Sequence, residues 1–164
     1  MRPARDLLGP RRVRVGCLVF QDPLPLCGLL YLLLYFDSSG FLRVGLLAAF
    51  LHECGHILVY WRFKHQLPVI AVTMTGFCMR TRGAGLTAAQ TLLLAAAGPG
   101  ANLLLAGVWY FRMSRRATLW GAAFLAANCL TAAFNLLPIP PLDGARMLGA
   151  LREVVTKKLH SAPK

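Results

Sequence analysis

The sequence contains few acidic residues and few charged residues altogether. It has six Asp and Glu against 18 Lys and Arg, and charged residues make up 15% of the 164 positions, below the roughly 25% of an ordinary soluble domain. Hydrophobic residues make up 57% of the chain. So few charges cannot form the surface of a soluble protein with so much apolar material. The composition excludes disorder, argues against a soluble nucleic-acid-binding module despite the net charge of +12, and favours an integral membrane protein.

Two familiar sequence signals are also missing. The five cysteines include no CxxC pair, and their odd number and apolar surroundings favour buried free thiols over metal ligands or disulfides. No A-x-A-like cleavage site follows the basic and apolar N-terminal region, which ends in Asp37-Ser38-Ser39-Gly40. We therefore expect this region to stay in the protein as its first membrane span.

Four apolar blocks predict an all-α polytopic membrane protein with about four transmembrane helices. Val44–Trp61 has 18 residues, about 27 Å as a helix, close to the ~30 Å hydrocarbon core of a bilayer. The first block is short, and Val15–Phe20 is expected to lead into it through the bend at Asp22-Pro23. The blocks are Leu24–Phe36, Val44–Trp61, Thr87–Phe111 and Ala117–Leu137.

Two shorter segments are expected outside the spans. Residues 66–82 are rich in β-branched residues around Gly76 and predict a short β-hairpin-like segment. Ala145–Lys158 has an amphipathic pattern and predicts a C-terminal surface helix. Because the chain shows no repeat and no second domain, we expect residues 1–164 to form a single membrane-embedded domain.

The basic residues predict an orientation in the membrane. With the N-terminus in the cytoplasm, four basic residues fall on the far side, which leaves 14 of the 18 on the cytoplasmic side, as the positive-inside rule expects. The clustering of three of those four argues against this orientation. The four are Arg43, Arg112, Arg115 and Arg116.

The second apolar block contains the motif His52-Glu53-Cys54-Gly55-His56. Histidines at positions i and i+4 of a helix project from one face and can bind one Zn²⁺, and Glu53 can act as a general base toward water. Chance occurrence is the alternative. However, a carboxylate inside a span costs about 2.5–3.5 kcal/mol and usually marks function, so the metal site is the better interpretation.

Asp143 is the candidate for a third ligand, because catalytic zinc sites normally have three protein ligands. The other unassigned acidic residues lie in flanks or loops. Asp143 follows three prolines, Pro138, Pro140 and Pro141, which end the fourth helix. Non-helical backbone at membrane depth is tolerated where it is buried in protein or lines a wet cavity. The alternative is a Pro-rich helix stop with a solvated carboxylate.

The motifs together resemble the site-2 protease family of intramembrane zinc metalloproteases. The HExxH within a span is followed roughly 80 residues later by Asn-Leu-Leu-Pro-Ile-Pro-Pro-Leu-Asp-Gly at 135–144, and residues 98–102, Gly-Pro-Gly-Ala-Asn, resemble the family's GPxxN element. The compact size without a PDZ-like insertion is most similar to the bacterial subgroup typified by the sporulation factor IVFB protease. The resemblance covers about residues 44–146.

This resemblance implies a three-helix catalytic core with one zinc ion per chain. His52, His56 and Asp143 would be the metal ligands and Glu53 the catalytic base. An equally good interpretation of Asn102 is an interhelical hydrogen bond. Further residues that match the family pattern would support the site or bind substrate: Asn102, Asn135, Pro138, Pro140 and Gly144.

The expected function is hydrolysis of peptide bonds in or near transmembrane segments of membrane-tethered proteins. The expected location is the bacterial cytoplasmic membrane, with the active site toward the cytoplasm. The partners would be a tethered protein substrate and the lipid bilayer, not nucleic acid, and a homo-oligomer or a regulatory membrane protein is left open. The edge of the strand segment near 69–79 would bind substrate by β-augmentation, or the segment is a structural hairpin. The alternatives are a zinc transporter, for which no second ligand cluster is found, and an inactive helix-binding scaffold, which has no need of Glu53.

Overall fold

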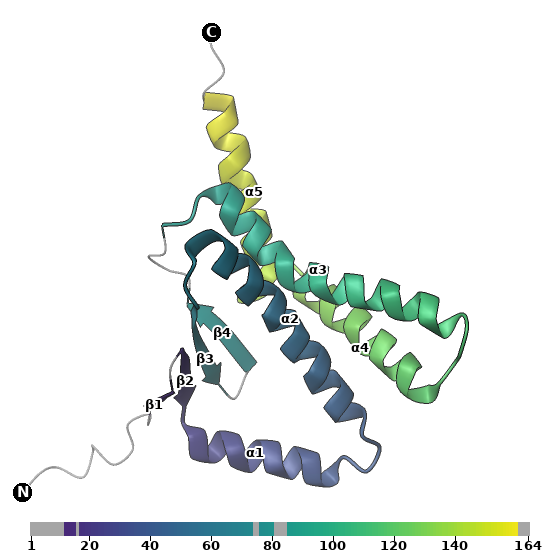
Figure 1. The fold of residues 1–164 in the computed structure, drawn as a ribbon. Coiled ribbons are helices and arrows are strands. Elements are labelled where there is room, and N and C mark those ends of the chain that lie inside the picture. The colour runs from purple at the N-terminus through teal and green to yellow at the C-terminus, as the bar shows by residue number, and fades with distance from the viewer. Residues whose placement is uncertain (1–11, 16, 74–75, 81–84, 161–164) are drawn as a thin grey trace, which may run out of the picture.

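A computed structural model describes residues 12–15, 17–73, 76–80 and 85–160, and within these ranges the chain forms five helices and four strands (Figure 1). Some of the basic residues that carried the predicted orientation lie outside the described residues: Arg2, Arg5, Arg11, Arg82 and Lys164.

Three helices pack together at the centre of the fold: α2 (Phe41–Lys64), α3 (Ala88–Met113) and α4 (Leu119–Asn135). α3 contacts both of the others, and α2 also contacts α4. The starts of α3 and α4 are fixed locally. The Thr87 hydroxyl accepts from Gln90 N while the Gln90 side chain accepts from Thr87 N, and Thr118 accepts from Gly121 N. These side chains satisfy backbone donors that a helix leaves unpaired at its first turn.

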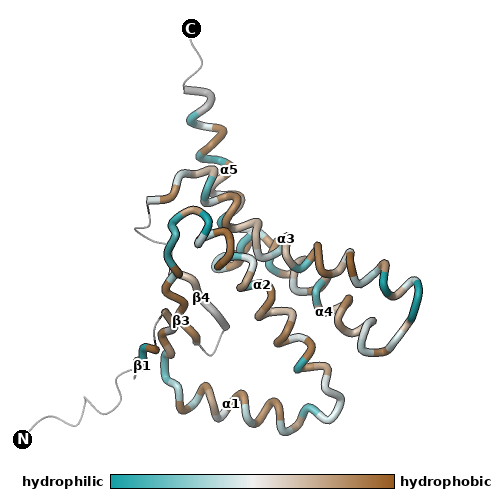
Figure 2. The backbone as a smooth tube through the Cα atoms, viewed as in Figure 1, coloured by the Kyte–Doolittle hydropathy of each residue, from teal (hydrophilic) through white to brown (hydrophobic). Residues whose placement is uncertain are grey.

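The surfaces of these helices are those of a membrane protein. Among the described residues, α2 and α3 are long and apolar enough to cross a bilayer, yet 17% and 33% of their most apolar windows are buried. A soluble protein rarely exposes apolar surface on this scale. Figure 2 shows long hydrophobic stretches along both helices and a hydrophilic turn between α3 and α4.

Among the described residues, fewer helices than the predicted four are long enough to span a bilayer. α1 (Pro23–Phe36) and α4 are apolar but have 14 and 17 residues, fewer than the about 20 that an upright span needs. In the part of the chain that the structure describes, two helices therefore meet the length requirement, and four spans stay a prediction.

The strands form one sheet in the order β1-β2-β3-β4. The expected hairpin near 66–82 is confirmed as β3 (Val69–Thr73) paired antiparallel with β4 (Gly76–Arg80). The expectation that Val15–Phe20 leads into the first span is wrong, because β1 (Arg12–Val15) and β2 (Leu18–Gln21) form a second hairpin.

This second hairpin corrects the all-α prediction as well. β2 pairs with β3 in parallel, and a parallel pair requires a long crossover. The crossover here is α1 and α2, so segments about 50 residues apart in sequence meet in one sheet. The short strands are rich in Val, Leu and Phe, which favour strands when one face can be buried.

The C-terminal amphipathic helix is confirmed as α5 (Asp143–His160). It packs against α3, and Figure 1 shows its C-terminal part extending beyond the other helices. Leu148, Leu151 and Val155 remain exposed along it. Its first residue, Asp143, is buried at the junction with α4.

We predict that a methyl group on the α2–α3 contact destabilises the fold. A Cβ at Gly55 would lie 2.6 Å from Ala97 O and 2.9 Å from Ala101 Cβ, whereas one at Gly45 has nothing within 4 Å. Gly55→Ala should therefore cost about 1–3 kcal/mol, read as a lower melting temperature in detergent. Gly45→Ala, on the same helix, should be neutral or stabilising. Equal melting temperatures for the two variants would contradict this packing.

Candidate metal centre

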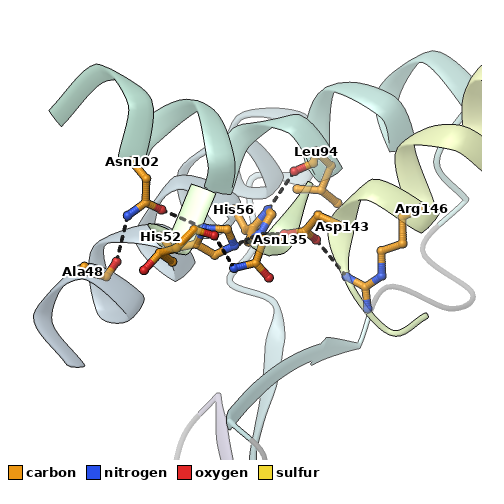
Figure 3. A network of polar contacts seen from close by, with 9 residues as sticks. Ala48, His52, His56, Leu94, Asn102, Asn135, Asp143 and Arg146 are labelled. Carbon is orange, nitrogen blue, oxygen red and sulfur yellow. Dashed lines mark hydrogen bonds and ion pairs between the residues drawn. The ribbon is translucent and has the colours of Figure 1, made fainter. Parts of the chain in front are cut away.

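His52 and His56 lie one turn apart on α2 and face α3 (Figure 3). Their exposed fractions are 3% and 4%, and their Nε2 atoms are 3.2 Å apart. The space beside them depends on Gly98 of α3, where a Cβ would collide with the Nε2 atoms of both rings. The absence of a side chain at Gly98 thus lets the two imidazoles converge at the centre of the helix bundle.

Asp143 reaches the histidines from the first turn of α5. Its Oδ2 lies 3.0 Å from the Nε2 atoms of both His52 and His56, and its residue is 5% exposed. The next residue, Gly144, fits closely against the carbonyl groups of Leu136 and Leu137, with which any Cβ would collide. This close approach allows α5 to begin directly against the end of α4, with its first carboxylate pointing inward.

A chain of hydrogen bonds across the bundle sets the tautomer of His52. Asn128 Nδ2 donates to Phe124 O at 2.8 Å, so Asn128 Oδ1 is the atom that accepts from Asn102 Nδ2, also at 2.8 Å. Asn102 Nδ2 donates to Ala48 O as well, at 3.1 Å. Asn102 therefore presents Oδ1 to His52 Nδ1 at 2.7 Å. Since that oxygen can only accept, His52 Nδ1 carries the proton.

The tautomer of His56 is set by the backbone. Its Nδ1 lies 2.8 Å from Leu94 O, and a carbonyl oxygen can only accept, so Nδ1 donates. In the neutral form both rings then have an unprotonated Nε2. Such partners at the second ring nitrogen are typical of metal-binding histidines, because they orient the ring and increase its basicity.

Three acceptor atoms consequently converge on one buried point. The ligand atoms of His52, His56 and Asp143 lie within 4.8 Å of one another. Two lone pairs and a carboxylate brought together away from water need a cation between them. Two imidazoles and one carboxylate are a donor set that suits zinc, so the residues fit the predicted metal.

A cavity of about 610 Å³ opens beside these three side chains. Glu53 lines it from α2 and is half-buried, while Ala71, Thr73 and Met79 line it from the sheet. A volume of this size is typical of small-ligand and active sites. The Glu53 carboxylate is not part of the acceptor cluster, and the cavity places it next to that cluster.

The remaining residues of the family pattern lie in different surroundings. Asn102 contacts His52 directly, as described above, whereas Asn135 lines the cavity and its Nδ2 donates to Thr131 O within its own helix at 2.9 Å. Pro138 and Pro140 are exposed in the connection between α4 and α5 and do not line the cavity.

Two further polar residues belong to the site: Asn128, which the sequence suggested only weakly as a partner of the histidines, and Arg146, which it did not suggest. Asn128 is fully buried and orients Asn102. Arg146 lines the cavity and forms an ion pair with Asp143, with 3.7 Å between Nη1 and Oδ1. The sequence offered one signal for each: a polar residue inside an apolar helix, and a basic residue three positions after the candidate ligand.

Comparison with known proteins gives the class of this fold. The chain superposes on the site-2 protease from Methanocaldococcus jannaschii with a TM-score of 0.62 and 19% sequence identity, over 91% of this chain and 73% of that one. The likeness establishes a site-2 protease fold.

Sequence comparisons find similarity to one family over part of the chain. The sequence model described as peptidase family M50 matches residues 111–164, which include Asp143 but not the HExxH motif. Two relatives are both named "Putative zinc metalloprotease Rip2". The one from Mycolicibacterium smegmatis (strain ATCC 700084 / mc(2)155) is 32% identical over 135 residues, covering 60% of this chain and 52% of the relative. The one from Mycobacterium tuberculosis (strain ATCC 25618 / H37Rv) is 33% identical over 129 residues, covering 57% and 50%.

The chain is thus similar over part of its length to peptidase family M50 and to zinc metalloproteases, and it shares the fold of a site-2 protease, in agreement with the resemblance that its motifs predicted. The predicted zinc cofactor is supported by the names of these relatives, which are zinc metalloproteases, and by the grouping of His52, His56 and Asp143, which could hold a metal ion. The chain spans about half the length of the curated relatives it matches. The similarity to the sporulation subgroup stays a prediction.

We predict that zinc binding depends on the missing side chain at Gly98. Gly98→Ala should displace both imidazoles, because its methyl group would occupy their position, and should reduce the zinc retained by the purified protein to well below one ion per chain. Gly100→Ala is the matched control, because a Cβ at Gly100 has nothing within 4 Å. Zinc can be counted by atomic absorption after dialysis. Full zinc occupancy in the Gly98 variant would contradict the described convergence.

Proposed function

We propose that this protein is a zinc-dependent intramembrane protease that hydrolyses peptide bonds in or near transmembrane segments of membrane-tethered proteins. The observation that carries the proposal is the convergence of two Nε2 atoms and a carboxylate oxygen, beside Glu53 and an open cavity, inside helices whose apolar surfaces face outward. We take the metalloprotease domain to extend over residues 1–164, with its core at about 44–146.

Each residue of the site has a distinct role in this proposal. His52, His56 and Asp143 hold the metal, which when bound supplies a Lewis acid that polarises a peptide carbonyl and makes water more acidic. Glu53, on the cavity side, accepts a proton from the attacking water and passes it to the leaving amine nitrogen. Asn102 keeps His52 in the tautomer that leaves Nε2 free.

The sheet offers a means of presenting substrate to this site. A transmembrane helix shields its peptide carbonyls, so a substrate must become extended before hydrolysis. β4 is a terminal strand in the sheet order, and Met79 of β4 lines the cavity. An extended segment that pairs with β4 would gain main-chain hydrogen bonds without requiring one particular sequence. This placement supports a substrate role for the hairpin over a purely structural one.

The proposed orientation places the N-terminus and the active site toward the cytoplasm of a bacterial cell. Because β2 pairs with β3, the chain returns to the same sheet after α1 and α2, as it would after crossing the membrane twice. Arg62 and Lys64 lie at the end of α2 that leads into this sheet, and Arg146 lies near the start of α5. Arg43 and Arg112 lie at the ends of α2 and α3 that are away from the sheet. A tethered protein substrate and anionic lipid are the partners that this arrangement suits.

The transporter alternative is less well supported. Within the described residues, the His52–His56–Asp143 group is the one cluster of three metal-binding side chains. An ion path would require further polar sites along the helices. The inactive-scaffold alternative leaves the position of Glu53 in the cavity without a purpose.

We predict that Glu53→Gln abolishes hydrolysis and leaves zinc bound. The purified full chain in proteoliposomes would be tested on a membrane-tethered reporter, and the variant should cleave at least about 100-fold more slowly, because a general base contributes about 10²–10⁴ in rate. Zinc content should stay near one ion per chain, because Glu53 is not a ligand. Glu153→Gln is the matched control, since Glu153 pairs with Lys157 on the exposed part of α5. Equal cleavage by wild type and Glu53→Gln would refute the proposed function.

A further inference from the structure

Arg146 lies on α5 three residues after Asp143, and the two oxygens of that carboxylate have different partners (Figure 3). Oδ2 faces His52 and His56, at 3.0 Å from each Nε2. Oδ1 faces the guanidinium, at 3.7 Å from Nη1. Residues at i and i+3 of a helix share a face, so the first turn of α5 presents the carboxylate together with its cationic partner.

The carboxylate group can still rotate although its backbone is held. Gly144 packs against the carbonyls of Leu136 and Leu137, which fixes where α5 begins but not the rotation about the Cβ–Cγ bond of Asp143. That rotation would bring both oxygens toward the histidines. The ion pair with Arg146 opposes it, and the buried position of the carboxylate strengthens the pairing relative to one in open water.

Arg146 is suited to this role by its place in the cavity. In the part of the chain that the structure describes, it is the only arginine or lysine that lines the cavity. Its side chain is 40% exposed, against 7% for Asp143, so it extends from the cavity wall toward the opening. It also places a positive charge near two carboxylates, Glu53 and Asp143, that share the cavity.

Asp143 can bind the metal through one oxygen or through both. Binding through one oxygen leaves more coordination positions free. Catalytic zinc sites have three protein ligands and keep one position open. If Asp143 bound through both oxygens, the second would compete for that position. Residues that pair with a ligating carboxylate commonly determine how that carboxylate binds the metal.

We propose that Arg146 is a positioning residue that holds Oδ1 of Asp143 away from the metal, so that Asp143 binds through Oδ2 alone and a coordination position stays free for substrate. The inference rests on the proposed function for the identity of the metal ligands. Arg146 lies outside the two sequence elements that identified the site, HExxH and residues 135–144.

The test compares Arg146→Gln, Arg146→Lys and the control Arg152→Gln in the full-length protein. Arg152 lies further along α5 and does not line the cavity. Zinc affinity is measured by competition with a chromophoric chelator, and coordination number by the visible spectrum of the cobalt(II)-substituted protein. Arg146→Gln should weaken zinc binding about 10- to 100-fold and weaken the cobalt absorption as the coordination number rises. Arg146→Lys should restore most of both, and Arg152→Gln should match wild type.

Two results would overturn the inference. One is wild-type zinc affinity together with an unchanged cobalt spectrum in Arg146→Gln. The other is an equal loss in Arg152→Gln, which would show a general effect of charge on α5. Neither readout requires a substrate, so these results are separate from the outcome of the Glu53→Gln cleavage assay. If the protein proved not to cleave the reporter, an effect of Arg146 on cobalt and zinc binding would still stand.

Discussion

The structure depends on three acceptor atoms that meet at one buried point between helices. His56 Nδ1 is committed to Leu94 O, and His52 Nδ1 is committed to Asn102 Oδ1. Both Nε2 lone pairs therefore face Oδ2 of Asp143. This arrangement is unfavourable in a low-dielectric interior without a cation, and a metal resolves it. The glycines, the buried asparagines and the proline-rich connection can all be understood as means of bringing these three atoms together.

The scarcity of carboxylates gains a structural explanation from this arrangement. The helices expose much apolar surface, and an ionised side chain within a membrane span is costly, so an acidic residue among them needs a compensating partner. Asp143 forms an ion pair with Arg146, and Glu53 lines the open cavity. The basic residues are far more numerous, and those that the structure describes lie near helix ends, on α5 and on β1 and β4, where they can reach water and anionic lipid.

Sequence patterns predicted the residues of the candidate metal site more fully than they predicted the fold. HExxH identified His52, Glu53 and His56 because the i, i+4 spacing fixes their relation within a helix, and the prolines before Asp143 identified a break that only a buried site tolerates. The β1–β2 hairpin was missed because short apolar segments beside a span look like part of it, and pairing with β3 is a long-range interaction. Asn128 and Arg146 gain their roles from contacts with Asn102 and Asp143, and the first of these crosses between helices.

The central claim is that two imidazoles and one carboxylate hold the zinc ion, and X-ray absorption at the zinc K-edge of the metal-loaded protein tests it most directly. We predict a first shell of nitrogen and oxygen atoms at about 2.0–2.2 Å with two imidazole rings. Cys54 lies within the same motif and is half-buried, so it is the natural competing ligand. A sulfur atom at about 2.3 Å, or a shell without two imidazoles, would contradict the account.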